Sequence, residues 1–256
     1  MKQYFITGTD TEVGKTYVTC QLLQAAQKAS LSAIGYKPIA AGCEQVDDEW
    51  VNEDALNIQK ASSKIRADKA IKITDNNELK SASENNEESG QTLPLHQINP
   101  IALKPAIAPH IAALEEGVAL TFDEIAKGLD ELHAYKPDLL LMEGAGGGRL
   151  PLTVGDEYTP TYYLSDVVKT LKMDVILVVG MRLGCLNHAL LTAEAIRADG
   201  LTIKGWVAND ITGNMTRYQE NLHSLKAMLP EPLLAEIPYQ VAPNDEALFV
   251  AIKQIS

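Results

Sequence analysis

Short, nearly continuous apolar runs alternate with segments of helical period along most of the chain. The runs that predict strands are residues 4–7, 32–38, 138–142, 175–179, 205–209 and 233–237. The helical segments among them are residues 17–29, 164–171, 188–198, 218–228 and 246–255. Strands buried on both faces have such continuous apolar runs, so the alternation predicts a three-layer α/β fold with a mostly parallel central sheet and helices on both faces.

The middle of the chain is less regular. Helical spacing returns at residues 52–58, 110–114 and 122–133, whereas residues 74–92 are rich in Asp, Asn, Glu and Ser and show no apolar period. This composition predicts a mobile, acidic surface insertion. With 46% apolar residues in 256, the chain can bury one sizeable core. We therefore expect a single domain over residues 1–256.

Composition excludes several classes of partner. The net charge of −12 disfavours nonspecific binding to nucleic acid or to an anionic membrane. No run of eighteen apolar residues occurs, and the first residues lead into a strand without a signal sequence. We expect a cytoplasmic protein with reduced thiols, because Cys20, Cys43 and Cys185 are odd in number and widely spaced.

The first strand leads into a candidate phosphate-binding loop. Gly14, Lys15 and Thr16 open the first helix, and backbone N–H groups at a helix N-terminus bind phosphate without an intervening side chain. Lys15 can neutralise the β- and γ-phosphates, and the Thr16 hydroxyl can ligate Mg²⁺. The strict pattern has a glycine at position 9, but here the glycine is Gly8. The loop is therefore a variant; the alternative is an ordinary strand-to-helix turn.

Other polar residues follow predicted strands. Glu143, at the end of the strand 138–142, is followed by Gly144, Ala145 and Gly146. Ligands of parallel sheets bind beyond the carboxyl ends of the strands, where a carboxylate can contact Mg²⁺ and glycines let the backbone approach a phosphate. Lys37 follows another strand and would point across the same edge as Lys15. The alternatives are a flexible turn for the glycines and a solvent-facing side chain for Lys37.

Three further positions are weaker candidates. Asp54 lies near a helix start, where an aspartate needs no function beyond capping. Residues 182–188 follow the strand 175–179 and open a helix whose N-terminus, with Asn187, could receive a carboxylate. His188 has no second His or Cys at metal-ligand spacing, so it is more simply a surface or capping residue. Asn209 ends a strand, and its carboxamide has the donor and acceptor that an adenine edge requires.

Six stretches, in chain order, carry a resemblance to a known family. They are residues 7–16 (TGTDTEVGKT), 35–38 (GYKP), 143–147 (EGAGG), 183–189 (LGCLNHA), 205–210 (GWVAND) and 236–238 (EIP). With them the chain resembles the dethiobiotin synthetases of the biotin pathway over nearly its whole length, and the variant loop is that family's own form. The resemblance implies a P-loop NTPase-like fold.

It also implies an activity and its partners. The family's enzymes are ATP- and Mg²⁺-dependent cyclo-ligases that act as homodimers. They close a ureido ring on 7,8-diaminopelargonate with CO₂ or bicarbonate, through a carbamate and a carbamic-phosphoric anhydride, and release ADP and phosphate. Protein groups in such phosphoryl transfers mainly position the reactants and stabilise charge.

The resemblance assigns roles residue by residue. The implied metal ligands are Thr16, Asp54 and Glu143, and the implied catalytic residues are Lys37, Lys15 and Thr11. The nucleotide-binding residues are Glu12, Val13, Gly14, Lys15, Thr16, Tyr17, Asp54, Glu143, Gly144, Ala145, Gly146, Asn209, Asp210, Ile237, Pro238 and Tyr239. The substrate-binding residues are Lys37, Ala41, Gly184, Cys185, Leu186 and Asn187, with residues 184–187 acting across the dimer interface.

The chain departs from the family pattern at two places, and two other functions are compatible with its sequence. Ala41 stands where the family often has Ser, which removes one hydroxyl contact to substrate, and the insertion at residues 74–92 is long. The same fold serves dimeric partition-type ATPase switches, but these have a lysine where this chain has Asp10, and glycines at Thr11 and Glu12. A diverged paralogous ligase is the other reading; related amidotransferase synthetases usually carry a glutaminase domain, for which this chain has no room.

Overall fold

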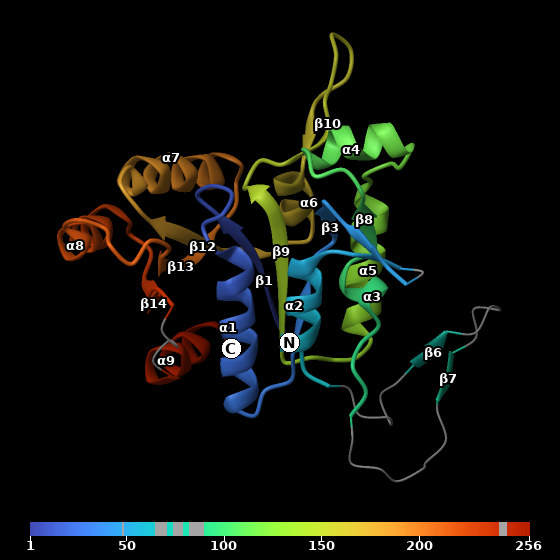
Figure 1. The fold of residues 1–256 in the computed structure, drawn as a ribbon, viewed down its shortest axis with the longest axis horizontal. Coiled ribbons are helices and arrows are strands. Elements are labelled where there is room, and N and C mark those ends of the chain that lie inside the picture. Colours follow the sequence, from blue (N-terminus) through green and yellow to red (C-terminus); the bar gives the residue numbers. More distant parts are fainter. Residues whose placement is uncertain (48, 65–70, 74–78, 82–89, 241–244) are drawn as a thin grey trace.

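The computed structural model describes residues 1–47, 49–64, 71–73, 79–81, 90–240 and 245–256. Its centre is a six-stranded sheet in which every neighbouring pair is parallel (Figure 1). The strand order is β14-β13-β12-β1-β9-β2. These strands are β1 (Lys2–Gly8), β2 (Ala33–Tyr36), β9 (Leu139–Gly147), β12 (Asp174–Met181), β13 (Ile203–Asp210) and β14 (Leu233–Ile237). The predicted parallel α/β fold is confirmed.

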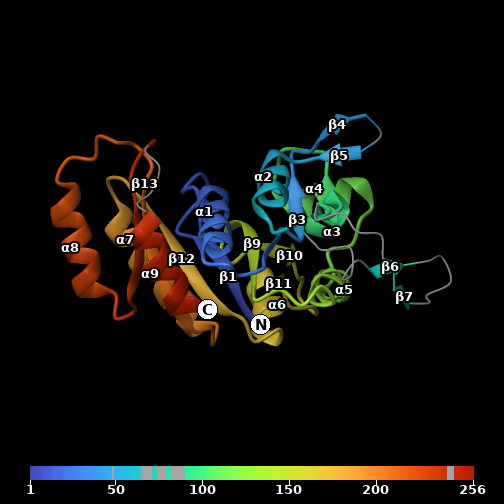
Figure 2. The same cartoon turned by 90° about the horizontal axis from the view of Figure 1, so that it is seen from below.

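Helices cover both faces of the sheet. On one face α1 (Lys15–Lys28) packs between α2 (Glu53–Ala61) and α9 (Asp245–Ile255). On the other, α6 (Leu164–Thr170) and α7 (Cys185–Ala198) approach Phe5 and Thr7 of β1, and α8 (Tyr218–Met228) packs on α7. Figure 2 shows the sheet between α1 and α6. The buried apolar side chains form one continuous cluster through these layers.

Most helix boundaries agree with the apolar period. The predicted helices at 122–133 and 218–228 are α5 (Phe122–His133) and α8. The helix at 52–58 is α2, whose start is capped because the Asn52 side chain accepts a hydrogen bond from the Ala55 N–H. However, α7 begins at Cys185, three residues before the predicted start, so the glycine-rich turn leads directly into the helix.

Short elements that the pattern did not predict surround the carboxyl edge of the sheet. β3 (Ile39–Ala41) pairs with β8 (Ile101–Leu103), and β4 (Glu44–Val46) pairs with β5 (Glu49–Val51). α3 (Leu95–Ile98), which was also not predicted, precedes β8, and the helix predicted at residues 110–114 follows it as α4 (Pro109–Glu116). β10 (Pro151–Thr153) and β11 (Tyr162–Tyr163) form a small hairpin. Three-residue strands carry too little period to be recognised from sequence.

The predicted insertion at residues 74–92 lies largely outside the described residues, since 74–78 and 82–89 are not described. Within its range β7 (Leu79–Ser81) pairs antiparallel with β6 (Ile71–Ile73). The single-domain organisation and the mobility of the insertion stay predictions. In the described ranges, no helix has both the length and the apolar character that a bilayer crossing needs.

Candidate active site

The loop between β1 and α1 has the conformation that its glycines allow. Gly14 has φ 80°, and Asn209 lies so close that a Cβ at position 14 would clash with the Asn209 Nδ2 atom. Both the backbone and the space therefore require glycine. The Thr9 N–H donates to the Val178 carbonyl at 3.0 Å, which anchors the loop to β12. The Thr11 N–H donates to the Asp10 carboxylate at 2.8 Å.

Lys15 is the buried cation of this loop. Its side chain folds back so that Nζ donates to the Asp10 carbonyl at 2.9 Å, and the residue is 8% exposed. Burial lowers the pKa of Lys15, while the nearby Glu143 carboxylate opposes this change. An ammonium enclosed in this way is positioned to neutralise a phosphate that binds the loop.

A second cation, Lys37, lies between two carboxylates. Its Nζ is 2.7 Å from Glu143 Oε1 and 3.4 Å from Asp54 Oδ2. Burial alone would lower the pKa of Lys37, but the Glu143 and Asp54 charges outweigh it and the net direction is upward. Lys37 therefore stays an ammonium at neutral pH. The Thr16 hydroxyl donates to the same Glu143 oxygen at 2.8 Å.

The parallel sheet brings these residues together from distant parts of the chain. Lys37 follows β2 directly, and its backbone is held because its N–H donates to Ile98 and its carbonyl accepts from Asn99 Nδ2, both at 2.8 Å. Glu143 lies opposite Ile6 of β1. It was expected at a strand end but lies inside β9, because the strand continues through the following glycines to Gly147 alongside the phosphate loop.

A cleft of about 1070 Å³ opens above this cluster, with α1, α2 and the start of α4 around it. Twelve of the predicted site residues line it: Thr11, Glu12, Gly14, Lys15, Thr16, Tyr17, Lys37, Ala41, Asp54, Gly144, Ala145 and Gly146. Glu143 and Val13 are almost fully buried, and Glu143 reaches the cluster from beneath through Thr16 and Lys37. The structure thus gathers most of the predicted phosphate, metal and catalytic residues.

The predicted substrate-carboxylate residues do not line this cleft. Gly184, with φ 95°, is the N-cap of α7, followed by buried Cys185 and then by Leu186 and Asn187. The preceding Leu183 is 95% exposed. The turn is tied to the phosphate loop because Arg182 Nη2 contacts Asp10 Oδ2 at 2.5 Å. Within one chain, therefore, the N-terminus of α7 lies at an exposed turn outside the lining of the cleft.

The predicted adenine residues lie on the other side of the phosphate loop. The Asn209 amide donates to the Val13 carbonyl at 2.8 Å, so one of its donors holds the loop. The Asp210 carboxylate accepts from the N–H groups of Thr212 and Gly213 at 3.1 and 2.9 Å. Ile237 is buried at the end of β14, and Pro238 and Tyr239 follow it. Their contact with a base stays a prediction.

Two contacts in the site were not predicted from the sequence. Thr19 Oγ1 lies 2.8 Å from Glu143 Oε2, and Arg182 pairs with Asp10. Thr19 carried a usable signal, because it lies three residues after Thr16 and so faces the same side of α1. The Arg182–Asp10 pair spans 172 positions and had no local signal.

The oxygen donors fit a magnesium ion. Thr16, Asp54 and Glu143 supply one hydroxyl and two carboxylates around the Lys37 ammonium, so they already hold a positive charge. Mg²⁺ in phosphoryl-transfer sites is bound by one or two carboxylates, with phosphates and water completing the octahedron. Among the described side chains, no group of three or more His, Cys, Asp or Glu residues is placed to hold a metal ion, so an ion here would depend on the Thr16 hydroxyl, phosphate and water beside the two carboxylates.

The fold and this site define a P-loop nucleotide-dependent α/β protein. A family model described as "AAA domain" matches residues 2–246. A solved structure, the MinC:MinD cell division protein complex of Aquifex aeolicus, matches at 9% identity with a TM-score of 0.51. The match covers 99% of this chain and 95% of that one, and it shows the fold alone.

Sequence relatives narrow this class to one family. The ATP-dependent dethiobiotin synthetase of Alteromonas mediterranea is 72% identical over all 256 residues, the full length of both chains. That of Aromatoleum aromaticum is 43% identical over 250 residues, which cover 98% of this chain and 96% of the relative. The chain belongs to the ATP-dependent dethiobiotin synthetase family. It is therefore an ATP-dependent ligase of biotin biosynthesis, as the resemblance in the sequence implied.

Proposed function

We propose that the chain converts 7,8-diaminopelargonate, CO₂ and MgATP into dethiobiotin, ADP and phosphate in the cytoplasm. The observation that carries this proposal is the buried Lys37–Glu143 pair, 2.7 Å apart, at the floor of the cleft and beside the Lys15 loop. Together with Lys15, the pair places two ammonium groups at the cleft, which suits a reaction in which negative charge builds up between a carbamate and a phosphoryl group.

In this reaction the protein's main task is to position the substrates, and proton transfer by side chains is secondary. One substrate amine takes up CO₂ as a carbamate, and a carbamate oxygen attacks the γ-phosphorus while ADP leaves. The second amine then attacks the carbonyl carbon, the C–O bond to phosphate breaks, and the ureido ring closes. Lys37 would orient the carbamate, and Lys15 would hold the γ-phosphoryl group. Thr11 lines the same cleft and would contact the reacting groups.

Thr16, Asp54 and Glu143 would hold Mg²⁺, which supplies charge neutralisation on the phosphates when bound. The cluster's present cation, the Lys37 ammonium, would then turn toward the carbamate. Residues 12–17 and 144–146 would surround the phosphates with backbone N–H groups. Asn209, Asp210 and residues 237–239 would hold the base beside the loop.

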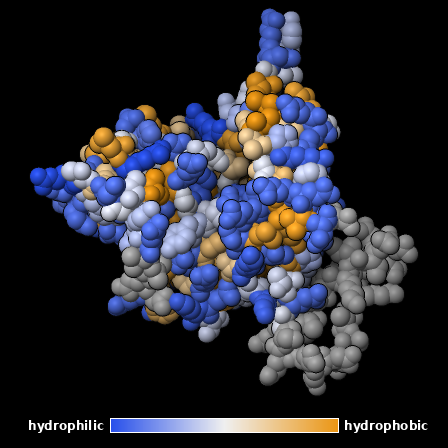
Figure 3. Space-filling view, viewed as in Figure 1, coloured by the Kyte–Doolittle hydropathy of each residue, from blue (hydrophilic) through white to orange (hydrophobic). Residues whose placement is uncertain are grey.

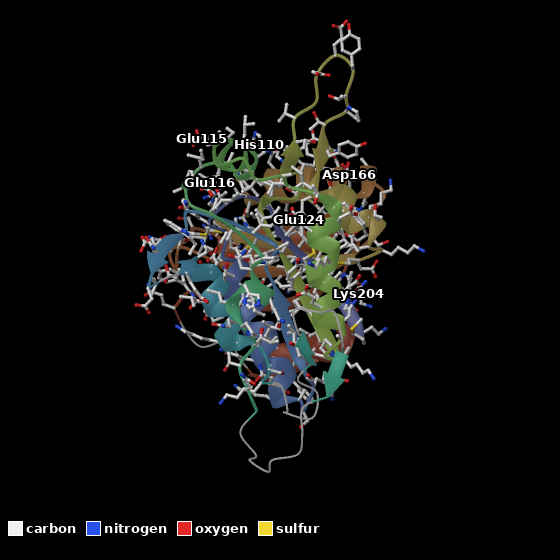
Figure 4. All side chains as sticks on the ribbon, turned by 90° about the vertical axis from the view of Figure 1, so that its right-hand side faces the viewer. His110, Glu115, Glu116, Glu124, Asp166 and Lys204 are labelled. Carbon is white, nitrogen blue, oxygen red and sulfur yellow. The ribbon has the colours of Figure 1, made fainter. Side chains whose placement is uncertain are left out.

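We further propose a homodimer in which the N-terminus of α7 from one chain binds the substrate carboxylate of the other. Support comes from exposed apolar side chains on and near α4, the β10–β11 hairpin and α7: Ile107, Ile111, Leu114, Val154, Leu183 and Leu191 are 42–95% exposed, and of these Ile107 lines the cleft. Figure 3 shows apolar surface gathered around α4 and the base of the β10–β11 hairpin. Figure 4 shows the hairpin loop projecting beyond α4, which carries His110, Glu115 and Glu116.

The decisive experiment measures phosphate release from MgATP with and without 7,8-diaminopelargonate plus bicarbonate, together with the mass of the organic product. We expect phosphate only in the presence of the diamine, in equal amount to dethiobiotin. Equal hydrolysis without the diamine would favour an ATPase switch on the same fold. Phosphate release coupled to a different amine would indicate a paralogous ligase.

A further inference from the structure

Thr19 is a buried hydroxyl that contacts the proposed metal ligand Glu143. It lies on α1, is 0% exposed, and follows Thr16 by one helical turn. Its Oγ1 is 2.8 Å from Glu143 Oε2 and 2.9 Å from the Lys15 carbonyl. A hydroxyl has one proton, so it donates to one of these two acceptors at a time.

The Glu143 carboxylate is the stronger acceptor of the two. Hydrogen bonds to an ionised oxygen are about twice as strong as those to a neutral one, and the Lys15 carbonyl lies inside α1, where the helix already gives it a backbone donor. Glu143 is 1% exposed, so water is not at hand to replace a lost donor. An unpaired buried carboxylate oxygen is costly.

The two oxygens of Glu143 have different partners. Oε1 accepts hydrogen bonds from the Thr16 hydroxyl and the Lys37 ammonium. In the proposed function this is the oxygen that would bind the cation. For Oε2, Thr19 is the partner among the hydrogen bonds found in the described ranges. Without Thr19 the carboxylate is held through Oε1 alone, and its broad terminal torsion is less restricted.

We propose that Thr19 is a positioning residue for Mg²⁺ binding: by holding Oε2 of Glu143 it keeps Oε1 directed at the cation. This inference rests on the proposed function, in which Glu143 is a metal ligand. Thr19 touches neither the metal nor the substrate. Partners that orient metal ligands typically contribute about 10–100-fold to metal affinity.

The test is the affinity for Mn²⁺, followed by electron paramagnetic resonance of the free ion, with the nonhydrolysable analogue adenylyl imidodiphosphate at saturation. We expect Thr19→Val to weaken Mn²⁺ binding by about tenfold and Thr19→Ser to restore it. The matched control is Thr170→Val on α6, because Thr170 Oγ1 donates at 2.9 Å to the carbonyl four residues earlier, as Thr19 can, but contacts no carboxylate.

Each outcome separates this inference from the proposed function. If the wild-type protein adds no Mn²⁺ binding beyond that of the analogue alone, the proposed metal ligands are wrong. If wild type binds and Thr19→Val binds equally well, Thr19 only satisfies its own helix and the inference is overturned. Should Thr19→Val fail to melt cooperatively, Thr19→Ala carries the same expectation, and wild-type affinity in that variant overturns the inference equally.

Discussion

The two ends of the candidate site are built differently. At the phosphate end, Lys37, Glu143 and Thr19 are at most 4% exposed and hold one another through bonds of 2.7–2.8 Å. At the α7 end, the residues predicted to bind the substrate carboxylate follow the 95% exposed Leu183 and do not line the cleft. One end is buried and joined by hydrogen bonds within a single chain, whereas the other lies at an exposed turn outside the lining of the cleft.

This difference matches the proposed division of labour. Charge stabilisation in phosphoryl transfer needs groups that are fixed before the reaction, and burial provides this. Recognition of a distant carboxylate can be supplied from a second chain, as long as the two chains associate in one symmetric arrangement. Substitutions at either end of the site test this division, and we expect their effects on activity to differ in size.

The largest effect should come from the buried end. Replacing Lys37 with Gln removes the ammonium beside the carbamate, so we expect turnover to fall by about 10²–10³-fold, the scale of one lost stabilising donor. ATP binding should change little, because Lys15, the proposed phosphate ligand, is retained. Steady-state kinetics and calorimetric ATP titration check this. Lys204→Gln, near the start of β13 and so at the opposite edge of the sheet from the site, is the matched control. Unchanged turnover in Lys37→Gln would remove Lys37 from the mechanism.

Mixing two inactive variants tests the exposed end. Asn187→Asp should repel the substrate carboxylate, and Lys37→Gln should block chemistry. If α7 serves the partner's cleft, a mixed dimer contains one intact site, so random reassociation should restore about a quarter of wild-type activity. The measurement is dethiobiotin formation after joint refolding, with each variant refolded alone as control. Absence of restored activity would place all substrate contacts in one chain.

Glu143→Gln should change the Mg²⁺ dependence of the rate more than it disturbs Lys37. The neutral amide is a poorer Mg²⁺ ligand, so we expect the Mg²⁺ concentration for half-maximal rate to rise by about tenfold or more. The variant should also melt at a lower temperature, because Lys37 loses its closest counter-charge at 2.7 Å. Glu124→Gln, in the first turn of α5, controls for the change of charge. An unaltered Mg²⁺ dependence would contradict the metal role.

The smallest effect should come from Ala41, between the two ends. Ala41 lines the cleft on β3, at the position where the resemblance in the sequence implied a Ser. Ala41→Ser should add at most one hydrogen bond, about 0.5–1.5 kcal/mol, and so lower the KM for the diamine by about two- to tenfold. The KM for ATP is the internal control. A raised diamine KM would show that the cleft has adapted to alanine.

Local pattern was sufficient for the framework and for the phosphate loop. The apolar period placed α5 and α8 at their observed bounds, and the order of strand, glycine turn and helix placed Lys15 and Thr16 at the start of α1. These features depend on residues within a few positions of one another, so the sequence by itself determined them. Lys37 and Glu143 were also candidates from the sequence, because each follows a predicted apolar strand.

Only the tertiary structure decided which of these groups touch. The Lys37–Glu143 pair spans 106 positions, and the Asn209 amide that supports the phosphate loop is 196 positions from Val13. The same holds for the Thr19–Glu143 bond and for the position of the α7 N-terminus outside the lining of the cleft. Such contacts depend on the lateral order and register of the strands, which hydrophobic period does not specify, because every buried parallel strand has the same apolar pattern.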